Sequence, residues 1–457
     1  MRGLLRISLC VLSVLLLLGC EPQDIVVPPE GNQGLPEVSE IPEIHLRVSL
    51  SEWNRLLALY DNYYKTKQYI KCDATYIDSE GKVTVQGAGL RLRGNTSRRR
   101  PESDATHKAG KTDWHHCHFG LNFDYFTKDA AHQVRDIHKV NLKWFKDDGN
   151  YVREVFCYDL FHRYGIWTAP HSSHCRLWLK VEGDPEETYF GVYELLESLD
   201  KRFLKAREGF GSPDGNLWKC RGGAGLNTIS TSFGHDDGSD AEYVYEYKGS
   251  AEQFDGARDQ LQDFILKLNG KGEESFYKWI QEVCDVNLLL RTYAVNVTVG
   301  MWDDYWRNSN NYYIYFNTTD KFAYKFFFIP FDYDNTLGTS LEMEDAGTQD
   351  PFHWGREENP LITRLLRFED FRQIYKEALL ELVDPDKALF YYTASMARIA
   401  EWQDAIREYV PNDTGEDCEI RDEPAYWGNQ HRYRLLTTGP DNFFQVKTET
   451  ILKYCNQ

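Results

Sequence analysis

The feature that most constrains this chain is an aromatic, hairpin-like stretch at residues 299–338. Two apolar runs, YYIYF (312–316) and YKFFFIPF (324–331), are separated by a polar NTTDKF turn. Aromatic and β-branched runs on either side of a short polar turn are typical of a β-hairpin. The stretch therefore predicts two antiparallel strands joined by a tight connection.

Four carboxylates flank this predicted hairpin, two before its first strand and two after its second. The two ends of an antiparallel pair lie side by side, so residues about 30 positions apart can share one site. Oxygen ligands suit Mg²⁺, Mn²⁺ or Ca²⁺ better than zinc. We therefore expect a hard-cation site that involves Asp303, Asp304, Asp332 and Asp334.

The N-terminus predicts export and lipid attachment. A short basic region, an apolar run at 9–18 and the sequence LLGC are typical of a lipoprotein signal peptide (1–19), which would leave Cys20 lipidated. An ordinary cleaved signal is the alternative. Residues 20–43 are rich in Pro, Glu and Gly and predict a flexible tether. We expect a bacterial cell-envelope protein, periplasmic or outer-surface, that meets the membrane only through its lipid anchor.

Charge and cysteine pattern exclude several classes of partner. The formal net charge of −19 argues against nucleic acid or anionic lipid as the main partner. No CxxC pair occurs, so a structural zinc site is not expected. The cluster HHCH at 115–118 places His116 and His118 on one face of a predicted strand, but an isolated histidine cluster is more often structural.

The chain divides by composition into a strand-rich first half and a helical second half. Residues 44–208 predict several strands with amphipathic helices at 49–64, where Ser49 and Glu52 fit a capping box, and at 152–165. Residues 209–250 are rich in Gly, Asp and Ser and predict a hinge or long loop. Residues 251–457 carry helical periodicity, with helices expected at 251–269, 274–300, 359–383 and 388–409. The fold class is therefore α+β.

A second candidate site follows the predicted strand at 82–94, which ends in GLRLRGNTSRRR. Arg91 and Arg93 are two residues apart and project from one face of the strand. Asn95 and Ser97 then supply small polar groups in a turn. Guanidinium groups and turn amides can together hold phosphate. The alternative is a solvated basic face that balances an acidic protein.

The spacing from Asp303 to Asn308 matches the catalytic loop of protein kinases. In that loop an Asp orients or accepts the proton of the hydroxyl group, and an Asn five residues later holds a metal ion. A later Asp, here Asp332, would hold the Mg²⁺ that bridges the phosphates. The alternative is structural, with Asp303 or Asp304 capping a helix and Asp332 and Asp334 capping a turn.

Taken together, these segments resemble the CotH family of spore-coat-type atypical protein kinases. The matching motifs are GLRLRGNTS, VNLKWFKDD, YFGVYELLESLDKRFL, WDDYWRNSNNYYIY and FIPFDYDNTLG, which span most of residues 44–340. With its lipobox, the chain is similar to lipoprotein members from Bacteroidetes. The resemblance implies an atypical protein-kinase-like two-lobe fold, with a β-rich N-terminal lobe and a mainly helical C-terminal lobe (251–457).

The resemblance also implies ATP-dependent phosphorylation of protein Ser or Thr hydroxyls with Mg or Mn. The nucleotide phosphates would meet Arg91, Arg93, Asn95, Ser97 and a lysine. Family members place that lysine shortly after the RGN turn, where this chain has HHCHFGLNF; Lys143 is one candidate, beside Lys108, Lys111 and Lys139. By the same carry-over, the catalytic carboxylate is Asp303 or Asp304, and the metal would be held by Asn308, Asn310 or Asn311 with Asp332 and Asp334.

Two other classes of function stay open at this stage. One is a catalytically inactive envelope protein of the same fold that binds a partner, a glycan or structural Ca²⁺. The other is a metal-dependent hydrolase or nucleotidyltransferase built on the same carboxylates. For the kinase-like reading the expected partners are a nucleotide and a protein substrate, and the oligomeric state is left open.

Overall fold

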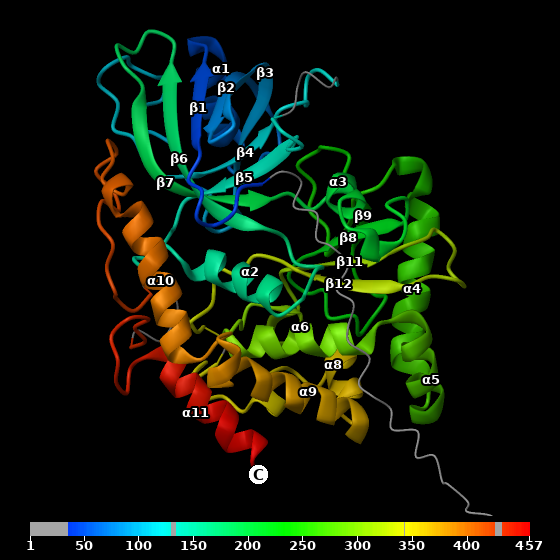
Figure 1. The fold of residues 1–457 in the computed structure, drawn as a ribbon. Helices are drawn as coiled ribbons and strands as arrows, with labels where there is room; N and C mark the ends of the chain where they lie inside the picture. The colour runs from blue at the N-terminus through cyan, green and yellow to red at the C-terminus, as the bar shows by residue number, and fades with distance from the viewer. Residues whose placement is uncertain (1–34, 129–133, 342, 426–431) are drawn as a thin grey trace, which may run out of the picture.

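The computed structural model describes residues 35–128, 134–341, 343–425 and 432–457 (Figure 1). The predicted signal peptide, Cys20 and most of the predicted tether lie outside these residues. The described end of that tether already packs, because Leu35 is buried in the core of the first sheet. Within the described part of the chain, none of the helices combines the length and the apolar character that crossing a bilayer requires.

The first sheet is a closed seven-stranded barrel that occupies the upper part of Figure 1. Strands run in the order β1-β2-β3-β4-β5-β7-β6, and a parallel pairing of β1 with β6 closes the circle. Alternating burial along β1 shows one face turned to the barrel interior. The seven strands are β1 (Glu43–Val48), β2 (Ile70–Asp78), β3 (Gly81–Arg93), β4 (His118–Asn122), β5 (Lys139–Lys143), β6 (Ser172–Val181) and β7 (Thr188–Glu197).

Helix α1 (Leu50–Asn62) covers the barrel and begins where the sequence predicts. The Ser49 hydroxyl accepts a hydrogen bond from the Glu52 backbone N–H at 3.3 Å, so it acts as the N-cap. Trp53, Leu56 and Leu57 are buried in the barrel core. The capping signal and the apolar spacing were together sufficient to locate this helix.

The second sheet contains the predicted hairpin and three further strands that were not predicted from the sequence. Its order is β12-β11-β8-β10-β9, and β11 (Tyr312–Phe316) pairs antiparallel with β12 (Phe326–Pro330) as expected. The segment 209–250, predicted as a hinge or long loop, contributes β8 (Asn216–Cys220), β9 (Phe233–His235) and β10 (Tyr245–Tyr247). These strands have three to five residues, too few to show a period-2 pattern, and they exist because β8 pairs with the distant β11.

Helices surround this second sheet and share its core. Residues 274–300, predicted as one helix, form two, because the Asp285 side chain caps a new helix by accepting from the Leu288 backbone N–H. The predicted helix at 359–383 is likewise divided. The α-helices after α1 are α2 (Arg153–Arg163), α3 (Lys201–Lys205), α4 (Phe254–Gly270), α5 (Glu273–Val283), α6 (Val286–Thr298), α7 (Tyr305–Asn308), α8 (Pro360–Leu365), α9 (Glu369–Leu382), α10 (Tyr392–Ile406) and α11 (Phe443–Cys455).

Two hydrophobic cores result, one inside the barrel and a larger one among the helices and the second sheet. Helix α2 lies between the barrel and α6 in Figure 1, and its buried residues belong to the larger core. Short 3₁₀ turns complete the elements at Glu208–Phe210, Ala251–Gln253, Pro351–His353, Pro385–Lys387 and Arg407–Tyr409. The mixed sheets and helices confirm the α+β class, while the closed barrel was not predicted.

A buried ion pair secures the chain where it leaves the barrel. Arg207 donates to both carboxylate oxygens of Glu197, at 3.0 and 2.7 Å, and both side chains are 1% exposed. Arg207 also donates to the carbonyl oxygens of Trp167 and Ala169. This arginine therefore ties the end of β7 to the loop that precedes β6.

We expect Arg207→Leu to lower the free energy of unfolding by about 3–5 kcal/mol, because it leaves the Glu197 carboxylate buried without its cation. Urea titration measures the effect. Lys278→Leu removes an exposed ion pair with Glu274 and should cost less than about 0.5 kcal/mol. Equal midpoints for the two variants would contradict this account of the buried pair.

Candidate functional site

A cavity of about 620 Å³ lies where the barrel meets the second sheet. Its walls come from β3 and the turn after it, from β5, from β8 and β10, and from both ends of the β11–β12 hairpin. Among the described lining residues, twelve are Lys or Arg and eight are Asp or Glu. The cavity is therefore strongly charged and carries a cationic excess, although the chain as a whole is acidic.

The hairpin brings its two acidic ends into this cavity as predicted. Tyr312 lies opposite Pro330 in the sheet register, so the chain before β11 adjoins the chain after β12. Asp303, from the first of these segments, and Asp332 and Asp334, from the second, all line the cavity. These three carboxylates, which are far apart in sequence, therefore line one cavity.

Asp303 is held by three amide side chains from the loop that follows it. Its carboxylate accepts from the Nδ2 atoms of Asn308 at 2.5 Å, Asn310 at 3.1 Å and Asn311 at 3.0 Å. Burial raises the pKa of Asp303, and the charge of Asp332 adds to this, although the three amides act in the opposite direction. The result is an oriented carboxylate with a raised proton affinity.

Asp304, the other candidate for the catalytic carboxylate, has a different position. It is 2% exposed and does not line the cavity. Its carboxylate accepts from the Arg307 backbone N–H and from the Asn296 side chain, both at 2.7 Å, and so caps α7. Burial raises the pKa of Asp304 to about 7. The structural alternative therefore describes Asp304, whereas Asp303 faces the cavity.

Lys143 connects the barrel to the acidic side of the cavity. Its Nζ lies 2.7 Å from Asp332 Oδ1 and 3.6 Å from Asp334 Oδ2, and it also donates to Glu154 on α2. Burial alone would lower the pKa of Lys143, but the three carboxylates raise it well above its ordinary value. Of the four lysines that spacing left open, Lys143 is the one that meets the carboxylates.

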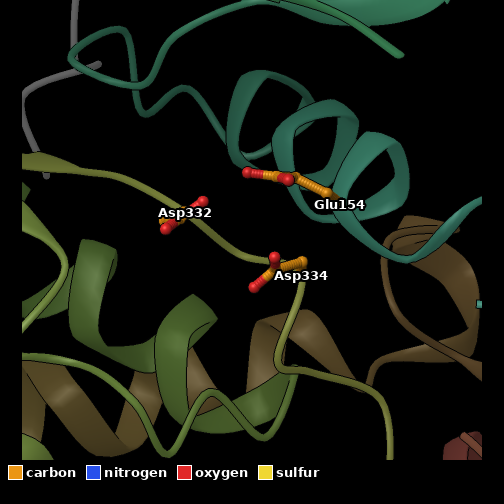
Figure 2. Close-up of side chains that lie close together, drawn as sticks. All are labelled: Glu154, Asp332 and Asp334. Carbon is orange, nitrogen blue, oxygen red and sulfur yellow. The ribbon is translucent and has the colours of Figure 1, made fainter. Parts of the chain in front are cut away.

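Glu154 is a site residue that the sequence analysis missed. Figure 2 shows it extending from α2 toward Asp332 and Asp334, and one oxygen from each of the three lies within 4.8 Å of the others. Glu154 also accepts from the Tyr333 backbone N–H at 3.0 Å. A strand lysine followed by a helix glutamate is the ion-pair pattern of kinases, and Lys143 with Glu154 would have been the available signal.

The surroundings of Asp332 and Asp334 shift the pKa values of these two carboxylates in opposite directions. Burial would raise the pKa of Asp332, but Lys143 and Arg93 lower it well below its ordinary value. Burial raises the pKa of Asp334 to about 8, and the neighbouring Asp332 and Glu154 charges reinforce this against Lys143. The surroundings thus favour the ionised form of Asp332 and the protonated form of Asp334.

The arginine turn lies on the barrel side of the same cavity. Arg91, Arg93, Asn95 and Ser97 all line it. Gly94 has φ +105°, and a Cβ there would lie 2.8 Å from Ser97 Oγ, so the turn requires glycine. Arg91 Nε is buried without a hydrogen-bond partner, and Arg93 forms no ion pair within the described part of the chain. The Arg91 guanidinium group also interacts with Tyr69, whose ring centre lies 5.3 Å away, so Arg93 and the Arg91 Nε remain for an anion.

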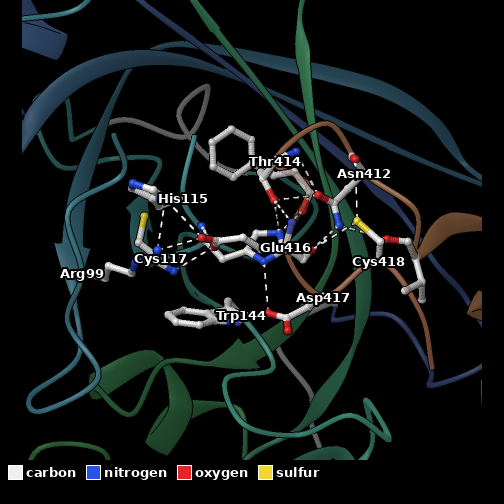
Figure 3. A network of polar contacts seen from close by, with 12 residues as sticks. Arg99, His115, Cys117, Trp144, Asn412, Thr414, Glu416, Asp417 and Cys418 are labelled. Atoms are coloured by element: carbon white, nitrogen blue, oxygen red, sulfur yellow. Dashed lines mark hydrogen bonds and ion pairs between the residues drawn. The ribbon is translucent and has the colours of Figure 1, made fainter. Parts of the chain in front are cut away.

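A segment near the C-terminus holds the chain just after this turn (Figure 3). The Glu416 carboxylate accepts from both Nη atoms of Arg99, at 2.8 and 2.7 Å, and from the His116 backbone N–H at 3.0 Å. Asp417 accepts from the Trp144 indole N–H at 3.0 Å. We call residues 412–418 the C-terminal strap.

The strap also explains the histidine cluster that the sequence singled out. His115 Nδ1 lies 3.1 Å from Glu416 and its Nε2 2.9 Å from the Ser103 hydroxyl, while His116 Nε2 lies 2.7 Å from the Phe190 carbonyl oxygen. His118 Nδ1 accepts from the Trp144 backbone N–H at 3.0 Å. Both ring nitrogens of His115 and of His116, whose Nδ1 lies 3.5 Å from Asp417, and one of His118 thus contact protein groups, as the structural interpretation expects.

The structure thus gathers most of the predicted site residues but not all of them. Asn308 supports Asp303 without lining the cavity, and Asp304 is a buried cap. Cys20 lies outside the described residues. The residues brought together are Arg91, Arg93, Asn95, Ser97, Lys143, Asp303, Asn311, Asp332 and Asp334.

We expect the affinity for Mn²⁺ to rise as the pH increases from 6 to 8 and then to level off. Asp334 has a pKa of about 8, so below that pH a divalent cation must displace its proton, which costs up to about tenfold in affinity per pH unit. Isothermal titration calorimetry measures this dependence. Asp334→Asn should flatten it, and a pH profile unchanged by that substitution would contradict the assignment.

Comparison with known proteins places the chain in a family. A family model described as CotH kinase protein matches residues 90–435, which include the arginine turn, Lys143, Glu154, the acidic hairpin and the C-terminal strap. No curated protein matches the chain. Because the match covers well over half of the 457 residues, the chain belongs to the CotH kinase protein family.

Proposed function

We propose that this protein is a kinase-like phosphotransferase of the cell envelope that uses Mg- or Mn-ATP to phosphorylate Ser or Thr hydroxyls of a protein. The observation that carries the proposal is one cavity that contains both an acidic oxygen cluster and an arginine turn. Phosphoryl transfer depends on positioning and on neutralising phosphate charge. A kinase-like two-lobe arrangement is part of the proposal and is supported by two separate cores with the cavity beside both.

The residues present fit a hard divalent cation. Glu154, Asp332 and Asp334 offer only oxygen ligands, and one atom from each lies within 4.8 Å of the others, a spread that a cation with ligand distances of about 2.0–2.6 Å can span. Such a cation would neutralise phosphate charge when bound. Lys143 Nζ lies among the same carboxylates, so the pocket already accommodates a positive charge.

The residues of the chain itself divide the remaining tasks. Arg91 and Arg93 would bind phosphate oxygens from the barrel side, where the Gly94 turn leaves the backbone open. Lys143 and Glu154 form the strand-to-helix ion pair that kinases use to set their phosphate-binding lysine. Asp303, oriented by three amides, would accept the proton of the attacking hydroxyl.

One observation also favours a non-catalytic alternative. Lys143 already balances part of the negative charge of the acidic cluster, so the site is compatible with a protein that binds a partner, a glycan or structural Ca²⁺ without chemistry. A hydrolase or nucleotidyltransferase is distinguished by its products, because nucleotidyl transfer releases pyrophosphate and retains the α-phosphate label. Labels at both phosphate positions, together with the release of phosphate and pyrophosphate, therefore separate these functions.

We expect residues 35–457 to transfer label from γ-labelled ATP, but not from α-labelled ATP, to protein in the presence of Mn²⁺. Asp332→Ala should lower the rate by about 100-fold or more, because it removes a charge-stabilising group in the cavity. Gel autoradiography against an exported-protein extract measures the transfer. Equal labelling by the wild type and the variant would overturn the mechanism, and α-label incorporation would support nucleotidyl transfer.

Substitution of Asp303 should mainly affect activity, whereas substitution of the adjacent Asp304 should mainly affect stability. Asp303→Asn should lose about 10²–10⁴-fold in rate, because a general base is removed, while its urea midpoint stays near the wild-type value. Asp304→Ala should lose about 0.5–2 kcal/mol of stability with its helix cap. The opposite pattern, an inactive and stable Asp304→Ala with an active Asp303→Asn, would reverse the assignment of the catalytic carboxylate.

A further inference from the structure

A lysine on the second sheet lines the cavity but has no role in the phosphotransfer proposed above. Lys219 on β8 lines the same cavity as Arg91, Arg93 and Asp332. It lies opposite Tyr313 on β11 and Glu246 on β10 in the sheet register, so these side chains share one face. Its Nζ packs over the rings of Tyr313, at 5.9 Å, and Phe331, at 5.3 Å.

The carboxylates nearest to Lys219 are engaged with other cations. Glu246 lies 2.9 Å from Lys67 Nζ, 3.1 Å from Arg221 Nη2 and 3.1 Å from Lys248 Nζ. Asp236 pairs with Lys248 and lies 3.7 Å from Lys67. In the described part of the chain, Lys219 itself forms no ion pair and no hydrogen bond from its side chain.

Two fully buried lysines of this chain have polar partners of their own, whereas Lys219, which is partly exposed in the cavity, has its Nζ over two aromatic rings. Lys143 meets three carboxylates. Lys447 donates to the Ala346 carbonyl oxygen at 3.0 Å and lies 4.3 Å from the centre of the Trp354 ring. Withdrawing an ammonium from water is costly unless it is paired. Lys219, which is partly exposed within the cavity, is therefore placed to pair with an anion that enters it.

The electrostatic surroundings identify the sign of that partner. Burial and the charges of Arg221, Lys248 and Arg93 lower the pKa of Lys219 well below its ordinary value, with Glu246 acting against them. Arg93 and Lys219 are both close enough to Asp332 to lower the pKa of that carboxylate. Cations from the barrel and from the second sheet thus converge beside the proposed metal site, and an anion placed there would relieve their mutual repulsion.

We propose that Lys219 binds phosphoryl oxygens of the ligand from the second sheet and completes, with Arg91 and Arg93 of the barrel, one polyphosphate-binding site. The inference rests on the proposed function for its ligand class, and it adds the residue that contacts the phosphates from the other wall. A polyphosphate bound in this way would touch both walls of the cavity. Polyphosphate binding would therefore depend on β8 as well as on the arginine turn.

The test uses magnesium tripolyphosphate, which carries the phosphates without a nucleoside, and isothermal titration calorimetry of residues 35–457. Lys219→Met should weaken binding by about 10- to 100-fold, since a hydrogen bond to a charged group contributes about 1.5–3 kcal/mol. Lys219→Arg should retain most of the affinity. Lys278→Met, at an exposed lysine outside the cavity, should bind as the wild type does.

A second readout separates anion binding from a packing role. An anion beside Lys219 raises its pKa, so binding by the wild type should take up more protons than binding by Lys219→Met, with a difference of up to about one proton. Repeating the titration in buffers of different ionisation enthalpy measures this number, and circular dichroism checks that each variant is folded.

The outcomes distinguish this inference from the proposed activity. Equal affinity and equal proton uptake in the wild type and Lys219→Met, or no binding by the wild type, would overturn the role of Lys219. Phosphotransfer that persists in such a case would leave the proposed function standing. Conversely, Lys219-dependent binding without any transfer of label would support the polyphosphate site and would contradict the kinase activity.

Discussion

The contact between Lys143 and three carboxylates is the interaction on which the site depends. The lysine comes from the last residue of a barrel strand, Glu154 from a helix of the larger core, and Asp332 and Asp334 from the exit of the hairpin. Three separate parts of the chain meet at one ammonium group. Because unpaired buried charges are costly, this cluster also favours the arrangement that brings the barrel and the hairpin to the same cavity.

The charge of the cavity contrasts with the charge of the chain. The protein carries a formal net charge of −19, yet the described residues around the cavity include twelve basic and eight acidic side chains. A cleft that is lined by an excess of charges of one sign attracts ligands of the opposite sign. The surrounding acidic surface would disfavour non-specific binding of polyanions elsewhere, so the basic groups act where they are enclosed.

Much of the site could be predicted because its signals are local. The hairpin was visible in two aromatic runs, the convergence of its ends follows from antiparallel pairing, and the shared face of Arg91 and Arg93 follows from strand geometry. Helix α1 was recognisable from its cap. Each of these features is determined by a few residues that are close in sequence, so it can be predicted without knowing the tertiary structure.

The rest depends on contacts between distant segments, which no local pattern records. Lys143 could not be selected among four lysines, because its partners lie on α2 and beyond β12. The strands β8, β9 and β10 were concealed by a Gly-rich composition, and with them Lys219. Asp303 and Asp304 are adjacent and chemically identical. Their roles differ only because α7 begins after Asp304, which makes Asp304 the buried N-cap and leaves Asp303 in the cavity.

The C-terminal strap has a consequence for the order in which the protein becomes complete. Arg99, His115 and Trp144 belong to the barrel half of the chain, but their acidic partners are Glu416 and Asp417. During synthesis from the N-terminus, the barrel strands are made long before the residues of the C-terminal strap that contact them. The chain next to the arginine turn would thus be held in place only when nearly the whole protein has been made, so shorter chains would lack these contacts.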